Sequence, residues 1–172
     1  MLVSNNSTGF RFQNSAINTG VLNDVQLVNN GTGMVALGTS STGPATVTIQ
    51  NGVVVNNGTV GIVSGGFSAV MVGNSTIANN GIGLEAQSIG AVLRASESAV
   101  TGNATGWLAV NGGQVISSGN NGIGGNVTGN AAPPIALVST TPTSTPTPTT
   151  NYLLNNAGIP LVDSSGALLT AS

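Results

Sequence analysis

Only 3% of the 172 residues are charged, against about 25% in an ordinary soluble domain, and neither histidine nor cysteine occurs. The two cationic side chains are arginines, so a nucleic-acid surface rich in Lys and Arg is excluded. Zinc, haem and iron–sulfur sites, and Ser-His-Asp or Cys-His catalysis, are excluded because their imidazole or thiol groups are missing. An apolar fraction of 40% argues against disorder, and the abundance of Val, Ile, Thr, Gly and Asn favours strands over helices.

A sequence repeat runs along residues 5–126. An Asn-Asn pair, replaced by Gly-Asn in the last two copies, recurs at intervals of 23 to 27 residues. Asn tolerates left-handed backbone conformations, and stacked Asn side chains can hydrogen-bond to one another. We therefore expect the second residue of each pair to join a structural ladder, with ligand binding as the alternative role. The expected ladder residues are Asn6, Asn30, Asn57, Asn80, Asn103 and Asn126.

A short strand is expected directly after each pair, over residues 8–12, 32–36, 59–64, 82–86 and 105–109. Apolar residues alternate with other residues in these segments, which is the pattern of a half-buried strand. The alternation predicts that one set of side chains fills the core, namely Phe10, Met34, Ile62, Leu84 and Trp107. The intervening set is expected to point outward: Arg11, Val35, Val63, Glu85 and Leu108.

Further apolar positions precede each pair at fixed offsets. The first row contains Val47, Val70, Leu93 and Ile116; the second contains Ile49, Val72, Ala95 and Ser118; the third contains Val54, Ile77, Val100 and Ile123. Each unit thus has about three short strands, and only stacking of units can bury their apolar faces. The sequence predicts an all-β parallel β-helix of five to six coils of ~23 residues, with coils about 4.8 Å apart.

The motifs Asn29-Asn30-Gly31-Thr32-Gly33 and Asn79-Asn80-Gly81-Ile82-Gly83 resemble those of the right-handed parallel β-helix, or pectin-lyase-like, superfamily. In particular, the chain is similar to bacterial repeat proteins with NNGxG coils over residues 3–130. The resemblance implies a right-handed β-helix, a fold that hosts lyases, hydrolases, adhesins and structural shafts. Enzymes of the superfamily use clustered acidic residues. That motif is absent, so the resemblance supplies no catalytic residue, no cofactor and no metal site.

The composition changes after the expected β-helix domain at 1–130. Residues 131–150 are rich in Pro and Thr and predict an extended linker. Residues 151–172 alternate apolar segments with turn sequences, which predicts a short β meander. That segment is too short for a core of its own, so it is expected to dock on the rod or on a neighbouring chain.

Individual candidate residues receive structural interpretations. Glu85 and Glu97 are expected on different faces, whereas glycoside hydrolysis needs paired carboxylates. These two residues, with Arg11, Asp24 and Arg94, are assigned to surface solubility, and Asp163 to a turn. Trp107 is expected to fill the core and Tyr152 to pack the C-terminal segment, with sugar stacking as the alternative for both.

The expected function is a non-catalytic structural or adhesive rod in an extracellular, cell-surface or virion assembly. It would self-associate, for example into filaments, through open ends or through residues 151–172. The alternatives are a polysaccharide-processing β-helix, lyase, hydrolase or tailspike-like, and a carbohydrate-binding module. No signal peptide, membrane span or nucleic-acid partner is expected from this sequence.

Overall fold

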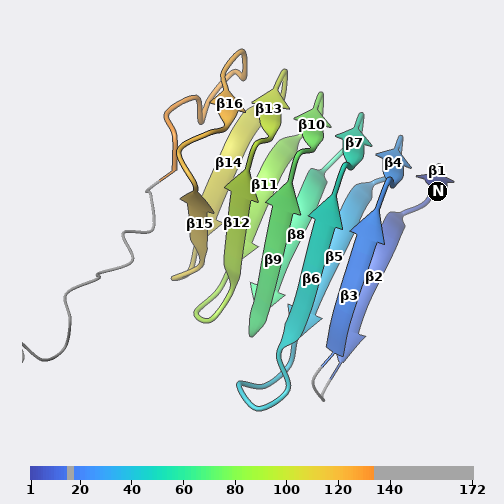
Figure 1. Ribbon diagram of the computed structural model, residues 1–172, viewed down its shortest axis with the longest axis vertical. Helices are drawn as coiled ribbons and strands as arrows, with labels where there is room; N and C mark the ends of the chain where they lie inside the picture. The colour runs from blue at the N-terminus through green and yellow to red at the C-terminus, as the bar shows by residue number, and fades with distance from the viewer. Residues whose placement is uncertain (15–17, 134–172) are drawn as a thin grey trace, which may run out of the picture. The chain divides into compact units, whose positions relative to one another are not determined.

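The computed structural model describes residues 1–14 and 18–133, which form three parallel sheets and about five coils (Figure 1). The expected all-β parallel β-helix is confirmed, while its right-handed winding stays a prediction. Each coil contributes one strand to each sheet in turn. Sheet A contains the shortest strands: β1 (Leu2–Ser4), β4 (Gln26–Val28), β7 (Val53–Val55), β10 (Thr76–Ala78), β13 (Ala99–Thr101) and β16 (Gly122–Ile123).

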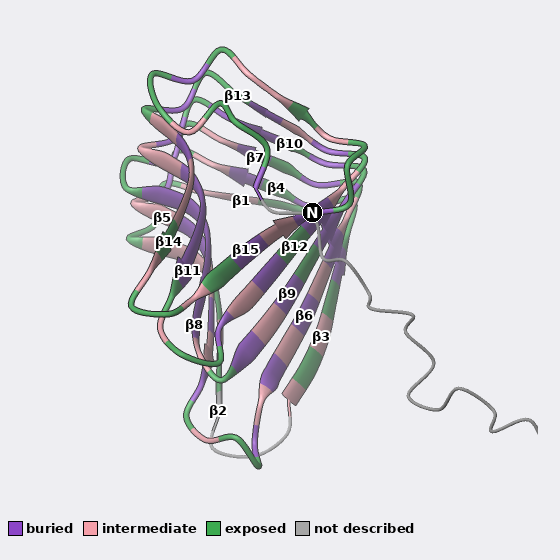
Figure 2. Ribbon diagram, turned by 90° about the vertical axis from the view of Figure 1, so that its left-hand side faces the viewer, coloured by how far each residue is buried: buried purple, intermediate pink, exposed green. Residues whose placement is uncertain are grey.

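The other two sheets are built from longer strands, and Figure 2 shows all three sheets enclosing one core. Sheet B contains β2 (Thr8–Asn14), β5 (Thr32–Gly38), β8 (Val60–Gly66), β11 (Ile82–Gln87) and β14 (Thr105–Val110). Sheet C contains β3 (Asn18–Asn23), β6 (Ala45–Gln50), β9 (Ser68–Gly73), β12 (Val92–Ser96) and β15 (Gln114–Ser117).

The core consists of rows in which equivalent residues of successive coils pair. Met34 pairs with Ile62 and Ile62 with Leu84, and all three side chains are fully buried. Phe10 and Trp107 extend this row at its two ends, where they are half-buried and packed against the core. Stacking like on like in this way lets short strands, each too small to bury its own apolar face, form a continuous core.

Two of the predicted rows change register in the last coil. Val47, Val70 and Leu93 are buried as expected, but Leu93 pairs with Val115, and Ile116 pairs with Arg94. The prediction for Ile116 is therefore wrong by one residue, and Ser118 is displaced in the same way, because Ala95 pairs with Ser117. The cause is a change in turn length. Residues 118–121 form a turn one residue longer than the equivalent 96–98, a difference that counting back from Asn126 does not reveal.

Two parts of the sequence interpretation lie outside the described residues. They are the linker beyond residue 133 and the meander at 151–172, together with Tyr152 and Asp163. Within the described part of the chain, no helix is long and apolar enough to cross a membrane.

Candidate functional site

The corner between sheets A and B is held by a ladder of Asn side chains. The first Asn of each pair adopts a left-handed conformation, with φ of 57° at Asn29 and 55° at Asn79, and this turns the next residue inward. Asn80 illustrates the bonding. Its Nδ2 donates to Asn103 Oδ1 at 3.0 Å and to Val54 O at 3.0 Å, and its backbone N–H donates to Asn103 Oδ1 at 2.9 Å. Side-chain bonds of this kind link all six expected residues: Asn6, Asn30, Asn57, Asn80, Asn103 and Asn126.

The last rung of the ladder is closed by a residue from the same turn. The backbone N–H and the Nδ2 of Asn126 both donate to Asn130 Oδ1, at 2.8 and 3.2 Å. Asn130 Nδ2 donates back to Asn126 O at 2.7 Å. Trp107 Nε1 donates to Ala131 O at 2.7 Å, so the chain beyond β16 lies against the end of sheet B. Asn130 thus occupies the position that the Asn of another coil would take.

A row of glycines lies directly beside the Asn ladder. A Cβ built on Gly83 would lie 2.5 Å from Gly106 O and 3.1 Å from Asn103 Nδ2. These distances leave no room for a methyl group, so the final Gly of the NNGxG motif is required by the close approach of two coils. The same contact with the next coil's carbonyl recurs at Gly9, Gly33, Gly61, Gly83 and Gly106.

A second internal ladder stands at the corner between sheets C and A, and the sequence interpretation missed it. Gly52 N–H donates to Ser75 Oγ at 2.9 Å, Ser75 N–H to Ser98 Oγ at 3.2 Å, and Ser98 N–H to Asn121 Oδ1 at 2.9 Å. Its sequence signal is a polar residue five positions before each of the last three ladder residues, Asn80, Asn103 and Asn126. Serine is so common in this chain that the row did not stand out.

An exposed Asn row runs outside this second ladder. Asn74 Nδ2 donates to Asn51 Oδ1 at 2.7 Å, and Asn51 Nδ2 donates to Asn23 Oδ1 at 3.1 Å. Asp24, Asn51, Asn74 and Glu97 all adopt positive φ at this turn. Glu97 is therefore positioned by a left-handed turn that Asn usually occupies.

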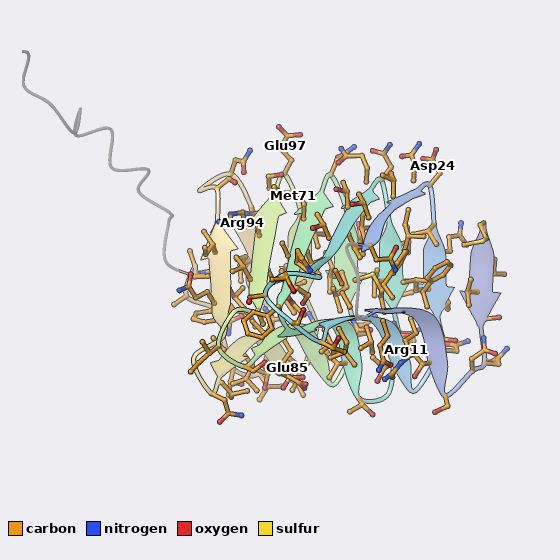
Figure 3. The ribbon with its side chains drawn as sticks, turned by 90° about the horizontal axis from the view of Figure 1, so that it is seen from below. Arg11, Asp24, Met71, Glu85, Arg94 and Glu97 are labelled. Atoms are coloured by element: carbon orange, nitrogen blue, oxygen red, sulfur yellow. The ribbon has the colours of Figure 1, made fainter. Side chains whose placement is uncertain are left out.

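The charged side chains do not converge. Figure 3 shows Glu85 and Glu97 on opposite sides of the β-helix, and no three acidic residues within the described ranges come together. Arg11 donates to Gln13 Oε1 at 2.8 Å within its own strand, and Asp24 Oδ2 accepts from Asn23 Nδ2 at 3.1 Å. Arg94 is exposed on the outer face of sheet C, beside Met71.

Glu85 corrects one expectation. It was assigned to the exposed surface, but its side chain is only 6% exposed, and Val63, expected to point outward, is 5% exposed. Glu85 pairs with Val63 on one side and with Leu108 on the other, and these neighbours flank its aliphatic stem in the middle of sheet B. The side chains on the two neighbouring strands thus cover Glu85, although it points out of the sheet. The alternation of residue types along one strand predicts which way a side chain points, but not whether neighbouring strands cover it.

Apolar side chains are exposed at several places in the described residues, and the turns between sheets B and C and the outer face of sheet C are two of them. Phe67 and Ile89 lie in the turns between sheets B and C, where they are 38% and 77% exposed. Val21 and Met71 are exposed on the outer face of sheet C, at 69% and 42%. Isolated exposed apolar residues are normal, and these four are spread over several coils.

Together, the parallel sheets and polar corner ladders define a parallel β-solenoid. No protein-family model, curated protein or solved structure matches the chain.

Proposed function

We propose that this chain is a non-catalytic structural or adhesive rod in an extracellular, cell-surface or virion assembly. The observation that carries the proposal is the placement of the carboxylates. Glu85 is buried in sheet B and Glu97 lies in a turn on the opposite side, so the two do not form the pair that glycoside hydrolysis requires. The likeness of its NNGxG coils to pectin-lyase-like repeat proteins belongs to this proposal and concerns the scaffold alone.

The partner we propose is another copy of the chain. In the described residues, β1, β2 and β3 each pair with one neighbouring strand, so the first coil presents three strand edges to which a further coil can pair. Such edges pair readily with further strands unless charges or prolines prevent it. With 3% charged residues, the chain has few of these protective groups, so the edges favour association.

The size of the particle in solution tests the proposal directly. We expect light scattering to give a mass at least twice that of one chain, with elongated particles in negative-stain images. Variants with a Lys at Leu2 or at Val21, both exposed side chains of the first coil, should reduce the mass because like charges then face each other. A soluble particle with the mass of one chain at all concentrations would contradict the assembly.

Polysaccharide processing is the competing function, and its test uses the two carboxylates. We expect no depolymerisation of acidic or neutral polysaccharides by the parent chain, and no difference on Glu85→Gln or Glu97→Gln substitution, because in residues 1–14 and 18–133 the two carboxylates lie on opposite sides and do not pair. An active parent that either substitution silences would overturn the non-catalytic assignment. The exposed Phe67 ring makes carbohydrate binding the second candidate, since sugars stack on aromatic faces. Glycan-array binding that Phe67→Ala abolishes would favour a carbohydrate-binding module.

A further inference from the structure

Asn-Gly pairs can modify themselves, and the sequence contains six of them. The glycine amide nitrogen attacks the Asn Cγ, a five-membered succinimide forms, and the side-chain nitrogen leaves as ammonia. Water then opens the ring to aspartate or to isoaspartate, in which the backbone runs through the side chain. The attack requires a glycine N–H that is free to lose its proton and an Asn side chain that is free to rotate. Hydrogen bonds to either group therefore suppress the reaction.

In five of the six pairs, both the Asn side chain and the glycine N–H are hydrogen-bonded. In the Asn ladder, the glycine amides donate to carbonyls of the preceding coil: Gly31 to Asn6, Gly58 to Asn30 and Gly81 to Asn57. The Asn side chains of the same pairs are ladder residues with partners above and below. In a fourth pair, Asn121-Gly122, the Gly122 N–H donates to Ser98 O and Asn121 Nδ2 donates to Ala95 O.

Asn51-Gly52 is the closest internal control. Asn51 is exposed and has φ of 55°, yet its side chain bonds to both Asn23 and Asn74. The Gly52 N–H donates to Ser75 Oγ at 2.9 Å. An exposed Asn-Gly pair in a left-handed turn can therefore still be fully hydrogen-bonded in this protein.

The sixth pair, Asn111-Gly112, lies in the turn between β14 and β15 (Figure 1). Both residues are exposed, with φ of 52° and 83°. Within residues 1–14 and 18–133, neither the Asn111 side chain nor the Gly112 N–H makes a hydrogen bond. The turn itself is closed by one bond, from Gly113 N–H to Val110 O at 2.9 Å. Breaking this single hydrogen bond thus allows the backbone rotation that brings the Gly112 nitrogen to the Asn111 Cγ.

We propose that Asn111-Gly112 is the site at which this protein undergoes spontaneous succinimide formation and deamidation. The product has one more carboxylate, which changes the formal net charge from −2 to −3. In a chain with so few charges, that change is large. It falls beside Ile89, whose Cγ1 lies 2.8 Å from where a Cβ on Gly112 would be. The modification therefore places a negative charge next to Ile89, a side chain that is 77% exposed in a turn between sheets B and C.

Peptide mapping by mass spectrometry after timed incubation of the folded chain at mildly alkaline pH tests the proposal. We expect Asn111 to gain the mass of one deamidation about tenfold or more faster than Asn51, because several additional hydrogen bonds must open at Asn51. In denaturant, all six pairs should react at comparable rates, which shows that the folded structure causes the difference. Equal rates at Asn51 and Asn111 in the folded chain, or no reaction at Asn111 while the denatured chain reacts, would overturn the proposal.

Two variants sharpen the test. Asn111→Gln should remove the modified peptide, since a glutamine side chain must form a less favourable six-membered ring. Ser75→Ala combined with Asn23→Ala and Asn74→Ala deletes the acceptor of the Gly52 N–H and both partners of the Asn51 side chain, and should raise the rate at Asn51 towards that of Asn111. If this combined variant leaves the rate at Asn51 unchanged in a chain that circular dichroism shows to be folded, hydrogen bonding does not control the reaction and the proposal fails.

Discussion

Replacing Asn80 by Ala is expected to lower the free energy of unfolding by about 4 kcal/mol, because four hydrogen bonds of about 1 kcal/mol each are lost in a buried site. Two are donated by Asn80 Nδ2, to Val54 O and Asn103 Oδ1, and two are accepted by Asn80 Oδ1 from Asn57. The substitution also leaves the Asn57 N–H buried without its acceptor. Urea unfolding followed by circular dichroism measures the loss.

The same substitution at the first rung is the matched control. Asn6 is exposed, and its side chain donates only to Ser4 O and Asn30 Oδ1. We expect Asn6→Ala to cost about 1 kcal/mol or less, because water replaces the lost partners. If Asn80→Ala destabilises the chain no more than Asn6→Ala does, the ladder contributes little to stability and another interaction must hold the coils together.

Gly83→Ala is expected to destabilise the β-helix by about 3 kcal/mol, although it adds a single methyl group. The new Cβ would lie 2.5 Å from Gly106 O, a backbone atom that can move only if the coil spacing changes. It would also press on Asn103 Nδ2 and Val100 Cγ1, both at 3.1 Å, so the strain reaches the ladder and the core together. Thermal and urea unfolding of the variant measure the effect.

Gly58→Ala provides the comparison for this methyl group. Gly58 lies in the turn that precedes β8, is exposed, and has no heavy atom within 4 Å of a built Cβ. We expect a change of about 0.5 kcal/mol or less, and of either sign, because Ala also restricts the unfolded chain. Similar losses at Gly58 and Gly83 would show that backbone freedom, rather than the contact between coils, explains the conserved spacing of glycine in the repeat.

The repeat carried most of the information about the fold. A row such as Phe10, Met34, Ile62, Leu84 and Trp107 was predictable because each residue follows a ladder Asn at nearly the same distance, and stacked coils pair these equivalent residues. The prediction failed where a turn changed length while the spacing of the ladder Asn residues stayed the same. The turn before Asn121 is one residue longer than its counterpart, so Val115 rather than Ile116 occupies the core. Turn length depends on local backbone conformation, which a count of residues does not specify.

The candidate site was less predictable for a different reason. The Asn ladder was expected because an Asn recurs at the same position in every coil, whereas the Ser75–Ser98–Asn121 ladder uses different residue types for one role. A hydrogen bond to the next coil needs only an oxygen acceptor at the correct position, so the residue type can vary. Similarly, the lack of hydrogen bonds at Asn111-Gly112 could not be predicted from the dipeptide itself. The same dipeptide occurs at five other positions, where hydrogen bonds fix both the Asn side chain and the Gly N–H.

The low charge was set by the sequence, and so was the kind of fold that tolerates it. Stacked coils place equivalent side chains about 4.8 Å apart, so a row of like charges would repel itself, and neutral Asn, Ser and Thr fill the polar rows instead. The tertiary structure alone decided where the few remaining charges and amides lie. Glu85 is buried between Val63 and Leu108, while Asn111 lies exposed in the turn between β14 and β15. Burial and hydrogen bonding depend on neighbours from other coils, and those neighbours are fixed only when the coils are stacked in register.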